Sequence, residues 1–211
     1  MRKYGFFAIV AAVFLFMNLS TAQQADATLG FSALTTPASG CTIDSNTGIP
    51  TCAEKGGVYP AIGADVIFHK RLGFGFDVAW RGGQGNYGGS GLPYRPILLD
   101  FNGVYQPRLG KKAGLDLVGG IGFQSTRFYS NTYNCSLGGL AGCTNFASTH
   151  HFLIDLGAGL RYYVWGHVFV RPEVRYYWVN NNPALGNNGP GFTSPNLIRI
   201  GASIGYTIGP E

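Results

Sequence analysis

The chain has 211 residues, of which 12% are charged, 33 are Gly, 12 are Tyr and 15 are Phe. This composition excludes a disordered chain, a coiled coil and an ordinary helical enzyme, and it favours an all-β protein. The formal net charge is +5 and no basic run is longer than two residues, which excludes the electrostatic footprint of a nucleic-acid-binding protein.

The first 22 residues have the pattern of a cleaved signal peptide. Arg2 and Lys3 form a positive start, residues 6–17 are an uninterrupted apolar run, and small residues precede and include Ala22. The run is too short to cross a hydrocarbon core of roughly 30 Å as a helix, so we expect cleavage after Ala22 and export. The mature chain, residues 23–211, then forms one domain with a net charge of +3.

The mature chain alternates apolar and polar residues in eight segments, which predicts eight strands. The predicted strands are residues 28–35, 58–70, 73–81, 95–107, 113–129, 150–164, 168–179 and 197–209. The predicted long connections are residues 36–57, 82–94, 130–149 and 180–196, and short turns join the other strands. Long and short connections alternate in this way in bacterial outer-membrane barrels. We therefore predict an all-β fold, an eight-stranded antiparallel up-and-down transmembrane barrel.

Each predicted strand has one apolar face, which carries charges only at strand ends (Lys70, Arg95 and Arg127). Lipid contact requires this, because a cation on a lipid-facing position at the membrane centre costs about 2 to 4 kcal/mol. Aromatic residues on these faces gather near strand ends, as interfacial girdles do. The predicted girdle residues are Trp80, Tyr176 and Trp178 toward the long connections, and Tyr105, Tyr162 and Tyr206 toward the short turns. A soluble barrel or sandwich with a shared apolar core is the alternative.

The opposite faces carry Gly, six acidic residues and several arginines. Because buried charges need partners and a narrow barrel fills its interior with side chains, we interpret them as an ion-paired lumen. The predicted lumen network consists of Asp65, Asp77, Asp100, Asp116, Asp155, Glu173, Arg161, Arg171, Arg175 and Arg199. The same residues would line a narrow polar path for ions, which is the functional alternative.

The four cysteines lie in two of the long connections, Cys41 with Cys52 and Cys135 with Cys143. An exported chain is oxidised, and pairing within each connection is geometrically the simplest of the three possible arrangements. We therefore predict two loop disulfides. A zinc site is the alternative, but the sequence has no Cys-x-x-Cys pair.

Residues 94–102, 107–112, 169–173 and 201–207 resemble stretches of the small eight-stranded outer-membrane barrels, the OmpA-like and OmpX-like group. The resemblance covers essentially the whole mature chain and is strongest with an uncharacterised bacterial branch. It implies a place in the bacterial outer membrane with lipid as the main partner, and it brings no known activity. Barrels of this group typically end in an aromatic residue, whereas this sequence ends in Glu211.

Catalytic chemistry would have to come from Ser148, His150, His151 and Asp155 near the start of the sixth predicted strand. His151 and Asp155 share a face, but four residues of strand span roughly 13 Å, so the spacing predicts no contact between them. We therefore predict no catalytic residue, no metal site and no cofactor.

Long connections on a rigid scaffold are where binding residues concentrate, so the loop aromatics are candidate contact residues, or they pack the loops on each other. Those aromatics are Tyr87, Tyr94, Tyr129, Tyr133 and Phe146. We expect a non-enzymatic outer-membrane barrel with a structural role or a loop-mediated role in adhesion to an extracellular ligand or surface. A narrow channel for ions or small apolar solutes is the alternative. A lipid-modifying enzyme and a soluble periplasmic barrel are the third and fourth alternatives.

Overall fold

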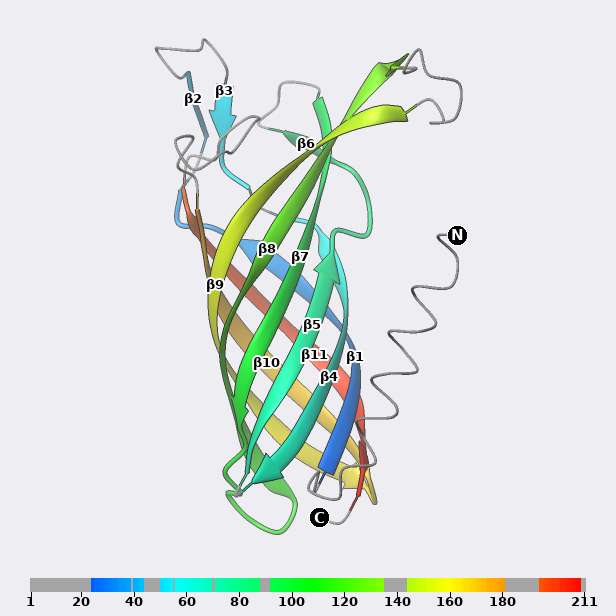
Figure 1. Cartoon of the computed structure of the whole chain (residues 1–211), viewed down its shortest axis with the longest axis vertical. Helices are drawn as coiled ribbons and strands as arrows, with labels where there is room; N and C mark the ends of the chain where they lie inside the picture. The colour runs from blue at the N-terminus through cyan, green and yellow to red at the C-terminus, as the bar shows by residue number, and fades with distance from the viewer. Residues whose placement is uncertain are drawn as a thin grey trace, which may run out of the picture.

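Eight long antiparallel strands close into a barrel in the computed structural model (Figure 1). The structure describes residues 24–38, 40–43, 50–54, 56–69, 71–87, 92–134, 144–180 and 194–209. The eight strands are β1 (Gln24–Thr35), β4 (Val58–His69), β5 (Leu72–Trp80), β7 (Leu92–Tyr105), β8 (Ala113–Asn134), β9 (Thr144–Trp165), β10 (Val168–Val179) and β11 (Asn196–Ile208). Successive strands pair with each other, and β11 pairs with β1 to close the sheet. The predicted all-β up-and-down barrel is confirmed.

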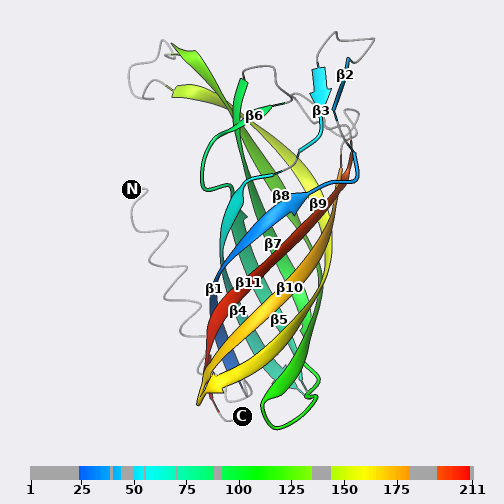
Figure 2. The same ribbon diagram turned by 180° about the vertical axis from the view of Figure 1, so that it is seen from behind.

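The long connections and the short turns lie at opposite ends of the barrel (Figure 2). The start of β1 and the end of β11 lie at the short-turn end. Three further short strands lie in the long connections: β2 (Cys41–Ile43), β3 (Pro50–Cys52) and β6 (Gly85–Tyr87). The described residues contain no helix long and apolar enough to span a membrane.

The hairpin formed by β8 and β9 continues past the long-loop rim of the barrel (Figure 1). The prediction of a loop over residues 130–149 is therefore wrong at both of its ends, because Asn134 still pairs with Thr144. The rings of Tyr129 and Phe146 pack across the two strands with their centroids 6.0 Å apart, and the Arg127 guanidinium lies 5.0 Å from the Phe146 ring. Such cross-strand contacts favour continued pairing.

Side chains along each strand alternate between an exposed outward face and a buried lumen, as the period of a strand requires. In β10, Val170 and Val174 are exposed, whereas Arg171 and Arg175 are buried. The outward face is thus apolar and the inward face is charged. This arrangement is the reverse of that in a soluble protein, whose charges face water.

The lumen is narrow enough that some inward positions require Gly. A Cβ atom at position 205 would lie 2.2 Å from the ring of Phe169. Phe169 is fully buried, and the Arg161 guanidinium lies 4.1 Å from its ring centroid. Gly205 therefore supplies the space in which an aromatic ring supports a buried cation.

Candidate functional site

Ion pairs fill the short-turn half of the lumen, where Arg161 of β9 contacts two carboxylates and Arg171 of β10 contacts three. Arg161 lies 2.6 Å from an Asp26 oxygen and 2.9 Å from an Asp116 oxygen. Arg171 Nη1 lies 3.1 Å from the same Asp116 oxygen and 3.2 Å from Asp65 Oδ2. Because these five side chains are at most 10% exposed, each charge has exchanged water for a charged partner.

Glu173 joins this half of the network to the long-loop half. Its carboxylate lies 3.2 Å from Arg171 Nε and 3.1 Å from Arg199 Nη2. Arg199 also lies 2.7 Å from Asp77. The network is therefore continuous from Arg161 at one end to Arg199 at the other.

Arg175 of β10 is the most connected cation in the described part of the lumen. Its guanidinium lies 3.0 Å from Asp100, 3.6 Å from Asp77, 3.7 Å from Asp155 and 3.8 Å from Glu173. The carboxylates come from four different strands, so one arginine links β5, β7, β9 and β10 across the lumen. All ten side chains predicted for the lumen lie inside the barrel.

Asp26 is a seventh inward carboxylate, and it was not predicted from the sequence. It accepts hydrogen bonds from Thr207 Oγ1 at 2.7 Å and from Gln24 Nε2, in addition to its pair with Arg161. Asp26 is absent from the predicted lumen residues because the first strand is predicted to start at residue 28, whereas β1 begins at Gln24. Asp26 is two residues before Thr28 and therefore lies on the same, inward face of the strand. This spacing is the sequence pattern that could have identified Asp26 as a lumen residue.

An apolar layer covers the ion pairs on the long-loop side. Its members are inward-facing and almost completely buried: Leu34, Tyr59, Leu98, Leu153, Tyr177, Val179 and Leu197. They come from six of the eight strands, so the layer extends across the lumen. This layer was not predicted, although the strict alternation of apolar and polar residues breaks at Leu98 and Leu153, each of which stands between two apolar neighbours.

The first long connection folds back over the barrel and is held by the disulfide between Cys41 and Cys52. Cys52 is fully buried against the rings of Tyr87, Tyr94 and Phe128, and its N–H donates to the Tyr87 hydroxyl at 3.1 Å. One predicted disulfide is thus confirmed. The other pair, Cys135 and Cys143, lies outside the described residues, as does most of the connection that follows β10.

Two of the candidate contact residues therefore brace the loops. Tyr87 and Tyr94 are 1% and 2% exposed, and their rings lie 5.6 Å apart. Phe146 is exposed on the β8–β9 hairpin, where it contacts Tyr129 and Arg127. The side chain of Tyr133 lies outside the described residues.

Glu54, a residue without any distinguishing pattern in the sequence, reaches into the barrel from this connection. It is 1% exposed and accepts a hydrogen bond of 2.6 Å from Gln124 Nε2, on the inward face of β8. Burial raises the pKa of Glu54 to about 7, against the opposing effects of the Gln124 hydrogen bond and of the Arg81 charge. Glu54 is therefore a titratable contact between the loop and the barrel wall.

The six predicted girdle aromatics lie on the outward face. Tyr105, Tyr162, Tyr176, Trp178 and Tyr206 are between 39% and 52% exposed, and Trp80 is partly exposed. Trp80 ends β5 at the long-loop side, whereas Tyr105 ends β7 at the short-turn side. Trp165, next to the β9–β10 turn, is a further outward aromatic and is 84% exposed.

The geometry does not assemble the candidate catalytic group. His151 is buried and its Nδ1 lies 3.1 Å from the carbonyl oxygen of Asn180. Asp155 contacts Arg175 in the ion-pair network, and its carboxylate oxygens form no hydrogen bond among the described residues. Ser148 and His150 are exposed. The arrangement places these residues in different surroundings.

Comparison with known proteins shows similarity at the level of the fold. No protein-family model and no curated protein sequence matches the chain. The crystal structure of Neisserial surface protein A matches with a TM-score of 0.54 at 13% identity, covering 87% of this chain and 95% of that one. A major outer membrane protein from Thermus thermophilus matches with a TM-score of 0.52 at 10% identity, covering 88% and 99%.

A third similar structure is Ail, the attachment invasion locus protein of Yersinia pestis, in complex with the heparin analogue sucrose octasulfate. It matches with a TM-score of 0.50 at 11% identity and covers 88% of this chain and 98% of that one. The chain therefore has the fold of small outer-membrane β-barrels.

Proposed function

We propose that the chain is a bacterial outer-membrane β-barrel, exported by a signal peptide over residues 1–22, that acts as a non-enzymatic scaffold for its outer loops. The observation that carries the proposal is the apolar outward face. Leu156, Phe74 and Ile200 are 61%, 69% and 56% exposed, and they belong to a continuous set of exposed apolar side chains around the barrel. A soluble monomer rarely exposes apolar patches larger than a few hundred Å². Lipid is the partner that fits this surface.

The filled lumen supports a scaffold over the alternative of a narrow channel. Two small cavities beside Arg171 and Glu173 have volumes of about 10 Å³ each, enough for roughly one water molecule. The apolar layer that includes Leu98 and Leu153 lies between the ion pairs and the long loops. A hydrated ion would have to lose its water there, which is the basis of a hydrophobic gate.

Two arginines at the long-loop side support an interaction with an anionic surface or ligand. Arg95 of β7 and Arg127 of β8 are direct cross-strand partners on the outward face, and neither forms an ion pair among the described residues. Arg95 Nε donates a 2.7 Å hydrogen bond to the Arg81 carbonyl oxygen, and Arg127 lies over the Phe146 ring. Like charges placed directly opposite each other destabilise a sheet, and an anion bound between them would offset this repulsion. This pair and the β8–β9 hairpin are the surface that we assign to adhesion.

Reconstitution into lipid vesicles tests the proposal. Brominated phospholipids quench nearby tryptophans, so lipids brominated near the headgroup should quench Trp80, Trp178 and Trp165 more than lipids brominated at the chain ends. The same preparation in a planar bilayer should give no discrete conductance steps. Quenching that is absent for both lipids would contradict a membrane barrel, and regular conductance steps would favour the channel.

A further inference from the structure

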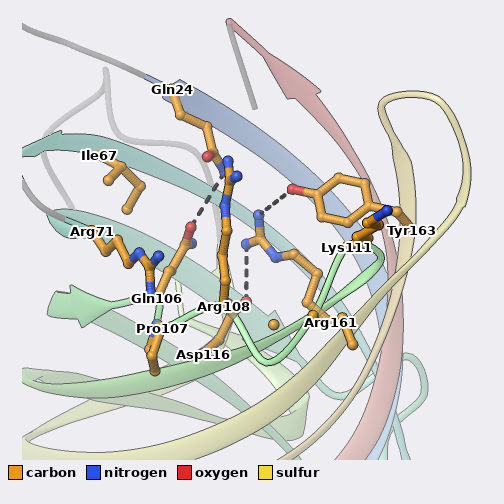
Figure 3. Close-up of a pocket in the computed structure, with 13 residues that line it drawn as sticks. Gln24, Ile67, Arg71, Gln106, Pro107, Arg108, Lys111, Asp116, Arg161 and Tyr163 are labelled. Carbon is orange, nitrogen blue, oxygen red and sulfur yellow. Dashed lines mark hydrogen bonds and ion pairs between the residues drawn. The ribbon is translucent and has the colours of Figure 1, made fainter.

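The barrel has a cavity at its short-turn end, and the proposed scaffold function assigns no role to it. Its volume is about 420 Å³, within the range of small-ligand sites. It is lined by residues of the β4–β5 turn, of the β7–β8 connection and of the short-turn ends of β1, β8 and β9. Figure 3 shows Arg71 on one side of this cavity, Arg161 on the other and Arg108 between them.

The cavity has more cations than anions. Among the described residues, four basic side chains line it, Arg71, Arg108, Lys111 and Arg161, and one acidic side chain, Asp116. Asp116 is already shared by Arg161 and Arg171 in the lumen network. Arg71, Arg108 and Lys111 are exposed side chains, and they form no ion pair among the described residues. Three cationic groups therefore face one cavity without a counter-charge in the described part of the chain.

The backbone at Arg71 is a second, independent observation. Arg71 has a φ of 75°, and it is the one described residue other than Gly with a positive φ. Gly adopts this conformation without steric cost, whereas a long side chain adopts it at a cost of about 1 to 3 kcal/mol. Its carbonyl oxygen accepts a 2.9 Å hydrogen bond from Gln106 N–H, which fixes the turn beside the cavity.

The floor of the cavity offers further donors. Arg161 is 3% exposed, and its Nε has no hydrogen-bond partner in the described part of the chain. The Gln106 side chain lies 3.3 Å from both Gln24 and Asp26, so it bridges the cavity wall to the ion-pair network. Planar guanidinium groups donate paired hydrogen bonds to phosphate and carboxylate oxygens.

We propose that this short-turn cavity binds an anion that carries phosphate groups and at least two negative charges, held by Arg71, Arg108 and Lys111. A single carboxylate would neutralise one of these three cations, whereas a diphosphate matches them better and fits the cavity volume. The ligand is either a soluble phosphate ester or the headgroup of a phospholipid. This anion site goes beyond the proposed scaffold function. Anion binding at the site does not depend on the scaffold role of the outer loops.

Calorimetric titration of the full mature chain in neutral detergent, with inorganic pyrophosphate as the probe, tests the site. We expect saturable binding that Arg108→Gln and Lys111→Gln each weaken by about tenfold or more, because each removes a hydrogen bond to a charged group. Lys112→Gln is the matched control. Lys112 is the exposed neighbour of Lys111 and does not line the cavity, so its loss should change the affinity by less than about twofold.

A further variant separates binding from folding. Arg71→Gly should weaken pyrophosphate binding while keeping or raising the resistance of the barrel to urea, because Gly relaxes the turn. Absence of saturable binding to the unmodified chain, or equal weakening by Lys111→Gln and Lys112→Gln, would overturn the proposal. Neither outcome bears on membrane insertion. A failure of the anion-site proposal can therefore be distinguished from a failure of the scaffold proposal.

Vesicles then distinguish the two sources of the phosphate group. The chain is placed in phosphatidylcholine vesicles with and without phosphatidylglycerol, and pyrophosphate binding is measured again. Binding that persists in both identifies a soluble anion. Loss of binding only with phosphatidylglycerol identifies the headgroup.

Discussion

Replacing Arg175 by Met should destabilise the barrel more than any change at its rim. Arg175 contacts four carboxylates. These carboxylates differ in how many other cations they still contact when Arg175 is removed. Asp77 keeps Arg199 at 2.7 Å, and Glu173 keeps both Arg171 and Arg199. Asp100 and Asp155, which are 0% exposed, contact Arg175 and no other cation in the described part of the chain.

The cost is that of buried carboxylates without a counter-charge. Removing one partner of a buried ion pair typically costs about 3 to 5 kcal/mol, and we expect at least this loss in the free energy of unfolding of Arg175→Met. Neutralising the orphaned acids in Arg175→Met/Asp100→Asn/Asp155→Asn should recover most of it. Asp155→Asn alone should cost about 1 kcal/mol or less, because its contact with Arg175 is 3.7 Å long.

Urea unfolding in detergent, followed by tryptophan fluorescence and by the mobility of the folded chain in gels, measures these differences. Arg108→Met removes the same type of side chain from the exposed rim and is the control, with an expected effect within about 0.5 kcal/mol. A loss below about 1 kcal/mol for Arg175→Met, or no recovery in the triple variant, would refute the assignment of a structural role to the network.

Three other changes test separate parts of the structure. The unfolded Glu54 pKa of 4.5 rises to about 7 in the folded chain, so its contribution to stability is complete below pH 4.5 and is lost as the pH rises to 7, a change of about 3 kcal/mol. Glu54→Gln should abolish this loss, which thermal unfolding between pH 4 and 8 would measure; an unchanged pH profile would contradict it. Cys41→Ser with Cys52→Ser should lower stability by about 3 kcal/mol and speed proteolysis of the first long connection without unfolding the barrel. Phe169→Ala should cost about 3 to 5 kcal/mol in urea unfolding, since it leaves a cavity over Gly205, and a Gly205→Ala change in that variant should recover part of the loss.

The barrel and its two faces could be predicted because strand period, connection length and the position of charges are all local properties of a sequence. The alternation at Asp77, Asp100 and Glu173 is enough to place these acids on one face. Which arginine contacts which acid could not be predicted, since the pairs join strands that are far apart in the chain. Arg161 contacts Asp26, for example, across 135 residues.

The parts that were missed depend on how the connections fold. Glu54 lies in a stretch that has no strand period, and only the return of the loop over the barrel explains its burial. Arg71 and Arg108 lie 37 positions apart in two turns, and closure of the sheet brings them to one cavity. The Asn and Ser content of the β8–β9 extension favours a loop, whereas aromatic pairing across the hairpin decides its structure.

The most direct test of the central claim is the location of the expressed chain in a Gram-negative cell, followed by heat-dependent gel mobility after detergent extraction. We predict recovery in the outer-membrane fraction without residues 1–22, and a compact form that migrates differently from the boiled chain. Recovery as a freely soluble periplasmic protein would contradict the account, because its apolar outward face would then lack the lipid that we assign to it.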